Sequence, residues 1–386
     1  MGQWTLAIDF GTCFTTAAYR QGADVTVLEI ENSRYLPSLV CLGENDELLT
    51  GRYALQRAAQ LPEEAERLPK RALVAGRAVL LRGRSVPATE LVAAVLSRVY
   101  TEALAQHQQT PPVSVTLTHP AAWTERELAL LGKAAQSAGI SSPVLLPEPV
   151  AAAMHYAHEF PIPDGGQLAI YDLGGGTFDV ALVCRTGDGF AVVGVPGGDP
   201  HIGGEDFDEA LLALLREHAL DRDPGPWERL WESTERTMLR QQLTLRHDVT
   251  VAREHLSASL RAPIHVPGYD DLFLIQRAEF EAAIDPLLRR TVDEFLRTVR
   301  ASGLTPDQLA AVVLAGGASR TPRVSDLLSQ VLGVPPRTVG DPKIVNVRGA
   351  LVEAPGQLGS RPVADAGTTP ARTPRVFEPD RDLFAE

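Results

Sequence analysis

A glycine-rich turn between two aspartates carries the residues of this chain that could do chemistry. Residues 168–183 run LAIYDLGGGTFDVALV: an apolar run ends at Asp172, three glycines and Thr177 follow, and Asp179 opens a second apolar run. Two apolar runs joined by glycines predict a β-hairpin. Glycines let backbone N–H groups approach an anion closely, and Thr177 adds a hydroxyl donor. Asp172 could hold a hydrated Mg²⁺ brought by such an anion. A purely structural glycine hairpin is the alternative.

The N-terminus repeats this pattern. A strand-like run, Trp4–Ile8, ends in Asp9-Phe-Gly-Thr-Cys-Phe14, and Thr16–Tyr19 can form the returning strand. Two hairpins of the same kind, far apart in the sequence, predict two related lobes that each offer one phosphate loop. This repetition is a stronger signal than either loop alone.

Composition limits the classes of protein that the chain can belong to. A chain of 386 residues with 44% hydrophobic content can bury a large core, most simply in two lobes. The net charge of −13 argues against nucleic acid or an anionic membrane as the main partner. Cys13, Cys41 and Cys184 lack CxxC spacing, which suits a reducing cytosol without disulfides or structural zinc. Because no apolar stretch reaches membrane-spanning length and the first strand starts near Met1, we expect a cytoplasmic protein without signal peptide or anchor.

Apolar periodicity and capping signals predict the elements between the loops. We expect a helix from about Gly51, a helix over Thr89–Gln106, a strand over Val113–Thr118, a helix capped by Thr124 and Glu127 and ended by Gly139, a charged helical region over 221–262, a short β pair over 263–276, a helix over Arg277–Ala301, a further helix starting at Thr305, a buried strand near 311–315 and a helix after Pro322.

The segment DLGGGTFDVALV resembles the second phosphate loop of the 70-kDa heat-shock (DnaK-type) chaperones, which share the fold of actin and the sugar kinases. The resemblance covers about residues 5–353 and implies an α/β, actin-like ATPase fold. Each of two lobes, 1–165 and 166–353, would have a ribonuclease-H-like mixed sheet flanked by helices, with nucleotide in the cleft between them. In the family the first loop has two threonines: Thr12 matches the first, and Cys13 replaces the second.

The resemblance also assigns catalytic roles. Within Leu68-Pro-Lys-Arg, Lys70 matches the catalytic lysine of the family, although a solvated surface lysine is the alternative taken alone. Glu148 lies in the turn before an alanine-rich helix, where it could cap that helix or face the cleft. We expect Lys70 to reach the γ-phosphate and to help position water, and Glu148 and Asp179 to orient water. The hydroxyls of Thr12 and Thr177 would bind phosphate oxygens, while Asp9 and Asp172 would hold Mg²⁺ through water.

Three further segments match the nucleotide site of the family: Gly203-Gly-Glu-Asp-Phe-Asp208, the helix with Arg253 and Ser257, and the turn Gly316-Gly-Ala-Ser-Arg320. In the family this last turn holds adenosine and its arginine packs on the base. Glu254 stands where the family often has a basic residue, and Lys343 stands where it has an acid, so the contacts in that corner are open. Contacts to ATP or ADP are expected from Gly11, Thr12, Cys13, Phe14, Gly174, Gly175, Gly176, Thr177, Gly203, Gly204, Glu205, Arg253, Ser257, Gly316, Gly317, Ala318, Ser319 and Arg320.

The sequence therefore predicts a slow, Mg²⁺-dependent ATPase that acts as a chaperone-like switch and is a monomer. A P-loop enzyme is excluded because GxxxxGK[ST] does not occur. A small-molecule kinase lacks a recognisable set of base and sugar-binding residues. A nucleotide-gated interaction module with little hydrolysis remains the alternative.

The segment 354–386 has the composition of a disordered, Pro- and Gly-rich tail, and we expect a protein that lacks a peptide-binding domain. A co-chaperone, an exchange factor or a separate client-binding protein could read the nucleotide state, and the sequence does not identify which.

Overall fold

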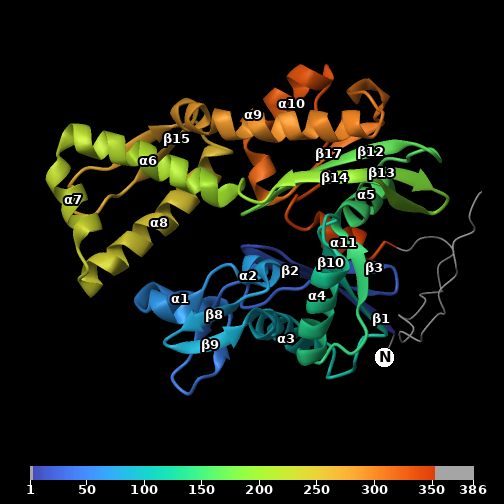
Figure 1. Ribbon diagram of the computed structural model, residues 1–386, viewed down its shortest axis with the longest axis horizontal. Coiled ribbons are helices and arrows are strands. Elements are labelled where there is room, and N and C mark those ends of the chain that lie inside the picture. Colours follow the sequence, from blue (N-terminus) through green and yellow to red (C-terminus); the bar gives the residue numbers. More distant parts are fainter. Residues whose placement is uncertain (1–2, 353–386) are drawn as a thin grey trace, which may run out of the picture. The chain divides into compact units, whose positions relative to one another are not determined.

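Two sheets built on the same hairpin carry the fold, which a computed structural model describes over residues 3–352 (Figure 1). The predicted tail, 354–386, lies outside the described residues. In each sheet the strand before the glycine turn pairs antiparallel with its successor and parallel with a strand from later in the chain. Both predicted hairpins are thereby confirmed.

The first sheet has the order β11-β10-β1-β2-β3, and β4 pairs with β2. Its strands are β1 (Trp4–Phe10), β2 (Phe14–Gln21), β3 (Asp24–Val27), β4 (Leu36–Pro37), β10 (Ser114–His119) and β11 (Val144–Pro147). Asp9 ends the parallel register with β10, where it lies opposite Thr118. The first aspartate therefore stands at the carboxyl edge of a parallel pair, where ligands bind in open α/β sheets.

The second sheet has the order β14-β13-β12-β17. Its strands are β12 (Gln167–Leu173), β13 (Phe178–Thr186), β14 (Gly189–Asp199) and β17 (Ala311–Ala315). Asp172 lies directly opposite Asp179 in the antiparallel register. Directly opposed residues in an antiparallel pair have their Cβ atoms about 5 Å apart, so this register forces two carboxylates together.

Short sheets and helices complete the described chain. The short sheets are β5 (Val40–Leu42), β6 (Leu48–Leu49) and β7 (Ala65–Glu66); β8 (Ala78–Leu81) and β9 (Arg84–Pro87); and β15 (Arg261–Ile264) and β16 (Phe273–Gln276). The helices are α1 (Gly51–Gln60), α2 (Pro69–Ala75), α3 (Ala88–Gln106), α4 (Glu125–Ser137), α5 (Glu148–Glu159), α6 (Gly204–Arg222), α7 (Pro224–Glu232), α8 (Arg236–Leu256), α9 (Arg277–Ala301), α10 (Pro322–Leu332) and α11 (Val345–Gly349), with 3₁₀ turns η1 (Pro62–Glu64), η2 (Pro306–Gln308) and η3 (Gly317–Arg320). None of the helices over 3–352 is long and apolar enough to span a membrane.

One predicted helix is wrong. The capping box of Thr305 and Gln308 is present, but it starts only the 3₁₀ turn η2. The N–H of Ala310 donates to the carbonyl of Gln167 at 2.8 Å, and β17 begins at the next residue. Because pairing with the second sheet begins only two residues after η2 ends, no helix can follow the capping box.

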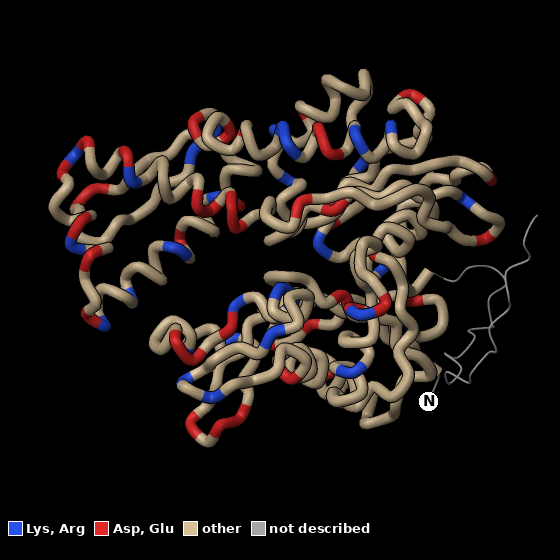
Figure 2. The backbone as a smooth tube through the Cα atoms, viewed as in Figure 1, with Lys and Arg blue, Asp and Glu red and all other residues tan. Residues whose placement is uncertain are grey.

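Separate apolar clusters lie on the faces of the sheets. One cluster combines the first sheet with α3 and α4. Another packs α6, α8 and α9 against one face of the second sheet, and a third packs α5 against its other face, as Figure 1 shows for α9 and α5. Acidic and basic residues are interspersed over the described chain (Figure 2). The boundary between lobes at 165/166 stays a prediction.

Helix α11 ties the end of the described chain back to the first sheet. Val347 and Leu351 are buried with Ala7 and Ala18 of β1 and β2. On its other side, Gly349 lies so close to α5 that a Cβ there would overlap the main-chain carbonyl of Ala151. The crossing of α5 and α11 therefore needs glycine at residue 349.

We expect Gly349→Ala to lower the free energy of unfolding by about 1–3 kcal/mol, because the two helices cannot separate without losing buried contacts. Gly132→Ala is the matched control: it lies within α4 with nothing within 4 Å of the added Cβ. It should raise stability by about 0.5–1 kcal/mol through helix propensity. Urea unfolding of both variants checks this, and equal effects of the same sign would contradict the close crossing.

Candidate active site

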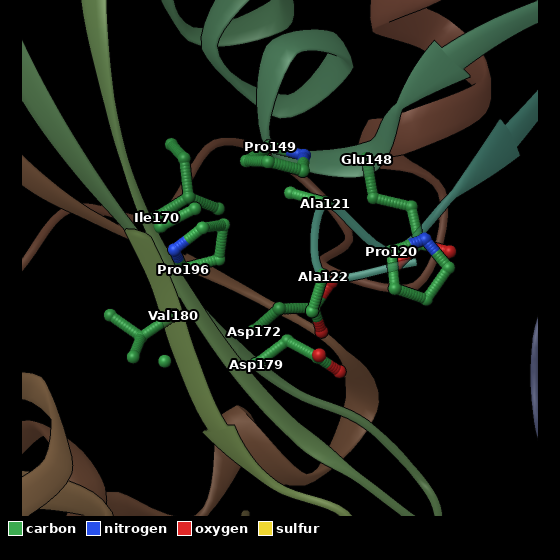
Figure 3. A pocket seen from close by; sticks show the side chains of 12 residues that line it. Pro120, Ala121, Ala122, Glu148, Pro149, Ile170, Asp172, Asp179, Val180 and Pro196 are labelled. Carbon is green, nitrogen blue, oxygen red and sulfur yellow. The ribbon is translucent and has the colours of Figure 1, made fainter. Parts of the chain in front are cut away.

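Lys70 lies among the acidic residues that the sequence analysis singled out. Its Nζ donates to Glu148 Oε1 at 3.0 Å, and only 11% and 10% of the two side chains are exposed. Glu148, Asp172 and Asp179 line one cavity, in which Figure 3 shows the two aspartates next to each other. Side chains from α2, α5 and the second hairpin therefore converge.

Local sequence places each of these groups. Pro69 is the first residue of α2 and Lys70 the second, so a preset proline φ angle opens the helix that presents the lysine. Glu148 is the first residue of α5, directly after Pro147 at the end of β11. A carboxylate at this position is favoured by the helix dipole while it pairs with Lys70. Capping and pairing are thus compatible.

Asp9 is held by two side chains that the sequence analysis did not identify. Its Oδ1 accepts from Thr118 Oγ1 at 2.8 Å, and its Oδ2 accepts from Asn346 Nδ2 at 3.2 Å. Asn346 belongs to α11, and its own Oδ1 is buried without a hydrogen-bond partner. A buried, unpaired acceptor beside a carboxylate is where a water or a hydrated cation would bind. The only sequence signal for Asn346 was that it is a polar residue within the short apolar run Ile344–Val347.

Burial and mutual repulsion perturb the acids. Burial, with Asp9, Asp172 and Asp179 nearby, raises the pKa of Glu148 to about 8 in spite of Lys70. Burial, with Asp179 and Asp9, raises the pKa of Asp172 to about 7, and burial also raises that of Asp179. For Lys70, burial favours the neutral amine, but Glu148 and Asp9 outweigh it and raise its pKa. The lysine therefore stays charged, and one ammonium serves four carboxyl groups.

The donor set fits Mg²⁺ held through water. Carboxylate and amide oxygens are the hard ligands that Mg²⁺ prefers, and excess negative charge would be relieved by a divalent cation. Among residues 3–352, no three His, Cys, Asp or Glu side chains are arranged to hold a metal ion directly. Asp9 and Asp172 therefore remain proposed ligands through water, with Asn346 beside them.

The two predicted phosphate loops touch. A Cβ at Gly175 would collide with the side chain of Cys13, and one at Gly176 with Thr12 and Arg71. The glycines are thus needed for close approach of one loop to the other. The Arg71 guanidinium donates to the carbonyl of Gly176 at 2.5 Å, a contact absent from our predictions. Burial raises the pKa of the Cys13 thiol to about 12, so this side chain stays neutral.

The start of α6 holds the second loop rather than offering free donors. The N–H of Gly204 donates to the carbonyl of Gly174 at 3.0 Å, and that of Glu205 to the carbonyl of Gly175 at 2.7 Å. The N–H of Gly203 donates to the Asp206 carboxylate at 2.8 Å. These three backbone donors, expected at a phosphate or ribose, are already used within the chain. Nucleotide contacts from 203–205 would have to involve other atoms and stay a prediction.

Other predicted side chains already have partners. Thr177 Oγ1 donates to Asp179 Oδ2 at 3.0 Å. Arg253 Nε donates to Asp208 Oδ1 at 2.6 Å, so the side chains of Thr177 and Arg253 are both held within the chain. Ser257 is the residue at the end of α8, where its backbone N–H donates to the carbonyls of Glu254 and His255.

Two of the three residues that depart from the family pattern, Glu254 and Lys343, pair with each other. Lys343 Nζ donates to Glu254 Oε1 at 2.9 Å. The same ammonium lies 5.3 Å from the centroid of the Phe14 ring and 5.0 Å from that of Tyr35. Glu254 and Lys343 therefore form an ion pair in which acid and base have exchanged places relative to the family pattern. The pair joins α8 to the 341–344 turn and the first hairpin.

The adenosine turn predicted at 316–320 lies against this pair. A Cβ at Gly317 would meet the aliphatic chain of Lys343, and Ser319 Oγ donates to the carbonyl of Gly316 at 2.7 Å. Arg320 forms an ion pair with Asp341. Strand β17 and the η3 turn thus bring the glycine turn beside the acidic cluster, since a Cβ at Gly316 would meet Asp172 Oδ1.

Two mixed sheets built on repeated glycine hairpins, flanked by helices, define the actin-like ATPase fold. A family model described as Hsp70 protein matches residues 72–366, and the chain belongs to this family. It is 29% identical to the chaperone protein DnaK of one strain of Thermus thermophilus and 30% identical to the chaperone protein DnaK of another strain. Each comparison covers 92% of this chain and 61% of the relative, so the chain spans about three-fifths of these relatives' length.

The raised carboxyl pKa values predict the pH dependence of stability. The pKa of Asp172 rises from 3.8 to about 7 on folding, so between these values the folded protein binds more protons than the unfolded chain. The free energy of unfolding therefore falls as pH rises from about 5 to about 7. Without Mg²⁺, we expect the melting temperature to fall less steeply over this range in Asp172→Asn than in the wild type.

Asp285→Asn is the control for this experiment. Despite partial burial, hydrogen bonds from Arg323 and Arg289 lower the pKa of Asp285. The contribution of its ionisation to the pH dependence of stability therefore lies below this pH range. Its removal should shift the melting temperature without changing the slope. Parallel curves for wild type and Asp172→Asn would contradict a raised pKa at residue 172.

Proposed function

We propose that this chain binds ATP with Mg²⁺, hydrolyses it slowly and uses the nucleotide state as a chaperone-like switch. The observation that carries the proposal is the buried Lys70–Glu148 pair at 3.0 Å, among the aspartates of two facing glycine hairpins. Membership of the Hsp70 family supports the class of activity. We propose that hydrolysis is slow, since a lysine at the γ-phosphate and a carboxylate that orients water suffice for slow hydrolysis.

Lys70 is proposed to stabilise charge on the γ-phosphoryl group. An ammonium has three N–H donors, and one of them is engaged with Glu148. The others can meet phosphate oxygens without breaking that pair. Phosphoryl transfer depends mainly on positioning and charge stabilisation, so a fixed, buried cation would stabilise the negative charge of the transition state.

Glu148 and Asp179 are proposed to orient the attacking water. Both line the cavity, and burial raises the pKa of each. A carboxylate with a raised pKa is a better proton acceptor near neutral pH than one at its ordinary value. When bound, Mg²⁺ would supply charge compensation for the phosphate oxygens, with Asp9, Asp172 and Asn346 holding its waters.

A nucleotide-gated interaction module with little hydrolysis is the second candidate. The Glu254–Lys343 pair favours it, because the Lys343 chain packs over Gly317 where the resemblance expects adenosine. In either case we propose that a separate protein, such as a co-chaperone, an exchange factor or a client-binding protein, reads the nucleotide state.

Single-turnover release of γ-phosphate from bound ATP separates the candidates. We expect slow release from the wild type and at least a roughly 100-fold loss in Lys70→Ala with ATP binding retained, because the lost cation acts mainly on the transition state. Asp172→Asn should raise the Mg²⁺ concentration needed for half-maximal release, because a proposed ligand of the hydrated ion is lost. Lys133→Ala, at an exposed position of α4, is the matched control and should match the wild type.

Tight ATP binding without release in any variant would remove the ATPase and leave the interaction module. Release that persists in Lys70→Ala would overturn the lysine assignment alone. The two failures are therefore distinct.

A further inference from the structure

Lys70 has a second neighbour that the proposed function does not use. Its Nζ lies 5.4 Å from the centroid of the Trp123 indole ring, within the distance at which an ammonium is attracted to an aromatic face. Trp123 is half-buried and packs against the first core cluster. The lysine is therefore contacted by an acid from α5 and by an aromatic ring from the loop between β10 and α4.

The turn that carries Trp123 is fixed by one carbonyl. The oxygen of Pro120 accepts from the N–H of Trp123 at 3.2 Å and from His119 Nδ1 at 2.9 Å. Because a carbonyl only accepts, Nδ1 carries the hydrogen. The His119 and Trp123 rings lie with centroids 6.5 Å apart and planes 21° from parallel. The main chain and a neighbouring ring thus restrict the indole.

The same turn borders the acidic cavity. Pro120, Ala121 and Ala122 line it together with Glu148 and the two aspartates (Figure 3). Burial lowers the pKa of His119, so its imidazole is neutral and does not repel Lys70. The turn therefore brings an aromatic face, and no competing charge, to the lysine.

An aromatic face suits a lysine that must remain available to phosphate. It attracts the ammonium but accepts little of its hydrogen-bonding capacity and does not neutralise its charge. A further carboxylate in the same place would hold the lysine more strongly and compete with phosphate. Tryptophan gives the strongest such attraction among the aromatic side chains.

We propose that Trp123 is a positioning residue for Lys70: its ring, carried by a turn whose main chain is held by the Pro120 carbonyl, keeps the ammonium beside Glu148. This inference rests on the proposed ATPase for its kinetic consequence. Its structural content, a Lys70 ammonium ordered by Trp123, stands independently of hydrolysis.

NMR can test that content directly, because the sequence contains three lysines, Lys70, Lys133 and Lys343. Lysine labelled with ¹³C at Cε gives three signals, and Lys70→Met assigns that of Lys70. In the wild type, ring current from Trp123 should displace the Lys70 signal from the position of exposed Lys133. In Trp123→Leu it should move toward Lys133, and in Trp123→Phe it should keep part of its displacement.

Single-turnover release supplies the kinetic arm. We expect Trp123→Leu to slow release about three- to thirty-fold, the range that a cation–π contact accounts for. ATP affinity should stay within about twofold, and Trp123→Phe should restore part of the rate. Trp231→Leu is the matched control: its ring also faces a cation, Arg246 at 5.3 Å, but it lies on α7. It should change neither the three signals nor the rate.

An unmoved Lys70 signal in Trp123→Leu would overturn the proposal. So would a moved signal with wild-type release, because the ring would then order the lysine without consequence. If the wild type releases no phosphate, the proposed ATPase fails, and the NMR result alone decides whether Trp123 positions Lys70. If Trp123→Leu does not fold, Trp123→Phe gives the same comparison with a smaller shift.

Discussion

One ammonium shared among four carboxyl groups is the constraint on which the rest of this structure depends. Lys70 pairs with Glu148, and the hairpin register opposes Asp172 to Asp179 beside them. Burial and the mutual repulsion of these carboxyl groups around one cation raise their pKa values. When the groups ionise, they carry more negative charge than Lys70 can balance, and a hydrated divalent cation would balance the rest. The cluster that stabilises a lysine in the folded protein is thereby also suited to a magnesium nucleotide.

Two helices, α5 and α11, connect the two sheets at this cluster. Helix α5 packs on the second sheet while its first residue, Glu148, reaches Lys70 of α2, and α11 returns to the first sheet with Asn346 on Asp9. The glycines at 175 and 176 let the loops meet, and Gly349 lets the helices cross. Each of these glycines is therefore needed for close packing, while the acids carry the proposed chemistry.

Sequence reasoning found what repeats and missed what depends on tertiary contact. The two hairpins were predictable because the Asp-Gly-Thr turn occurs twice, and the family resemblance singled out Lys70 and Glu148 as residues of one proposed site. Asn346 and Trp123 were not, since an isolated polar or aromatic residue has no local pattern. Glu254 and Lys343 looked like two separate losses, yet they form one ion pair. The capping box at Thr305 starts only a 3₁₀ turn, because the residues that follow it form β17.

Proton release on nucleotide binding tests the central claim most directly. Calorimetric titration with MgADP, in buffers of different ionisation enthalpy, counts protons without requiring hydrolysis. The pKa of Asp172 lies near 7 and that of Glu148 near 8, so a cation bound at this cluster must displace protons at neutral pH. The account predicts net proton release that decreases in Asp172→Asn. Binding with no proton release, or with the same release in the variant, would contradict it.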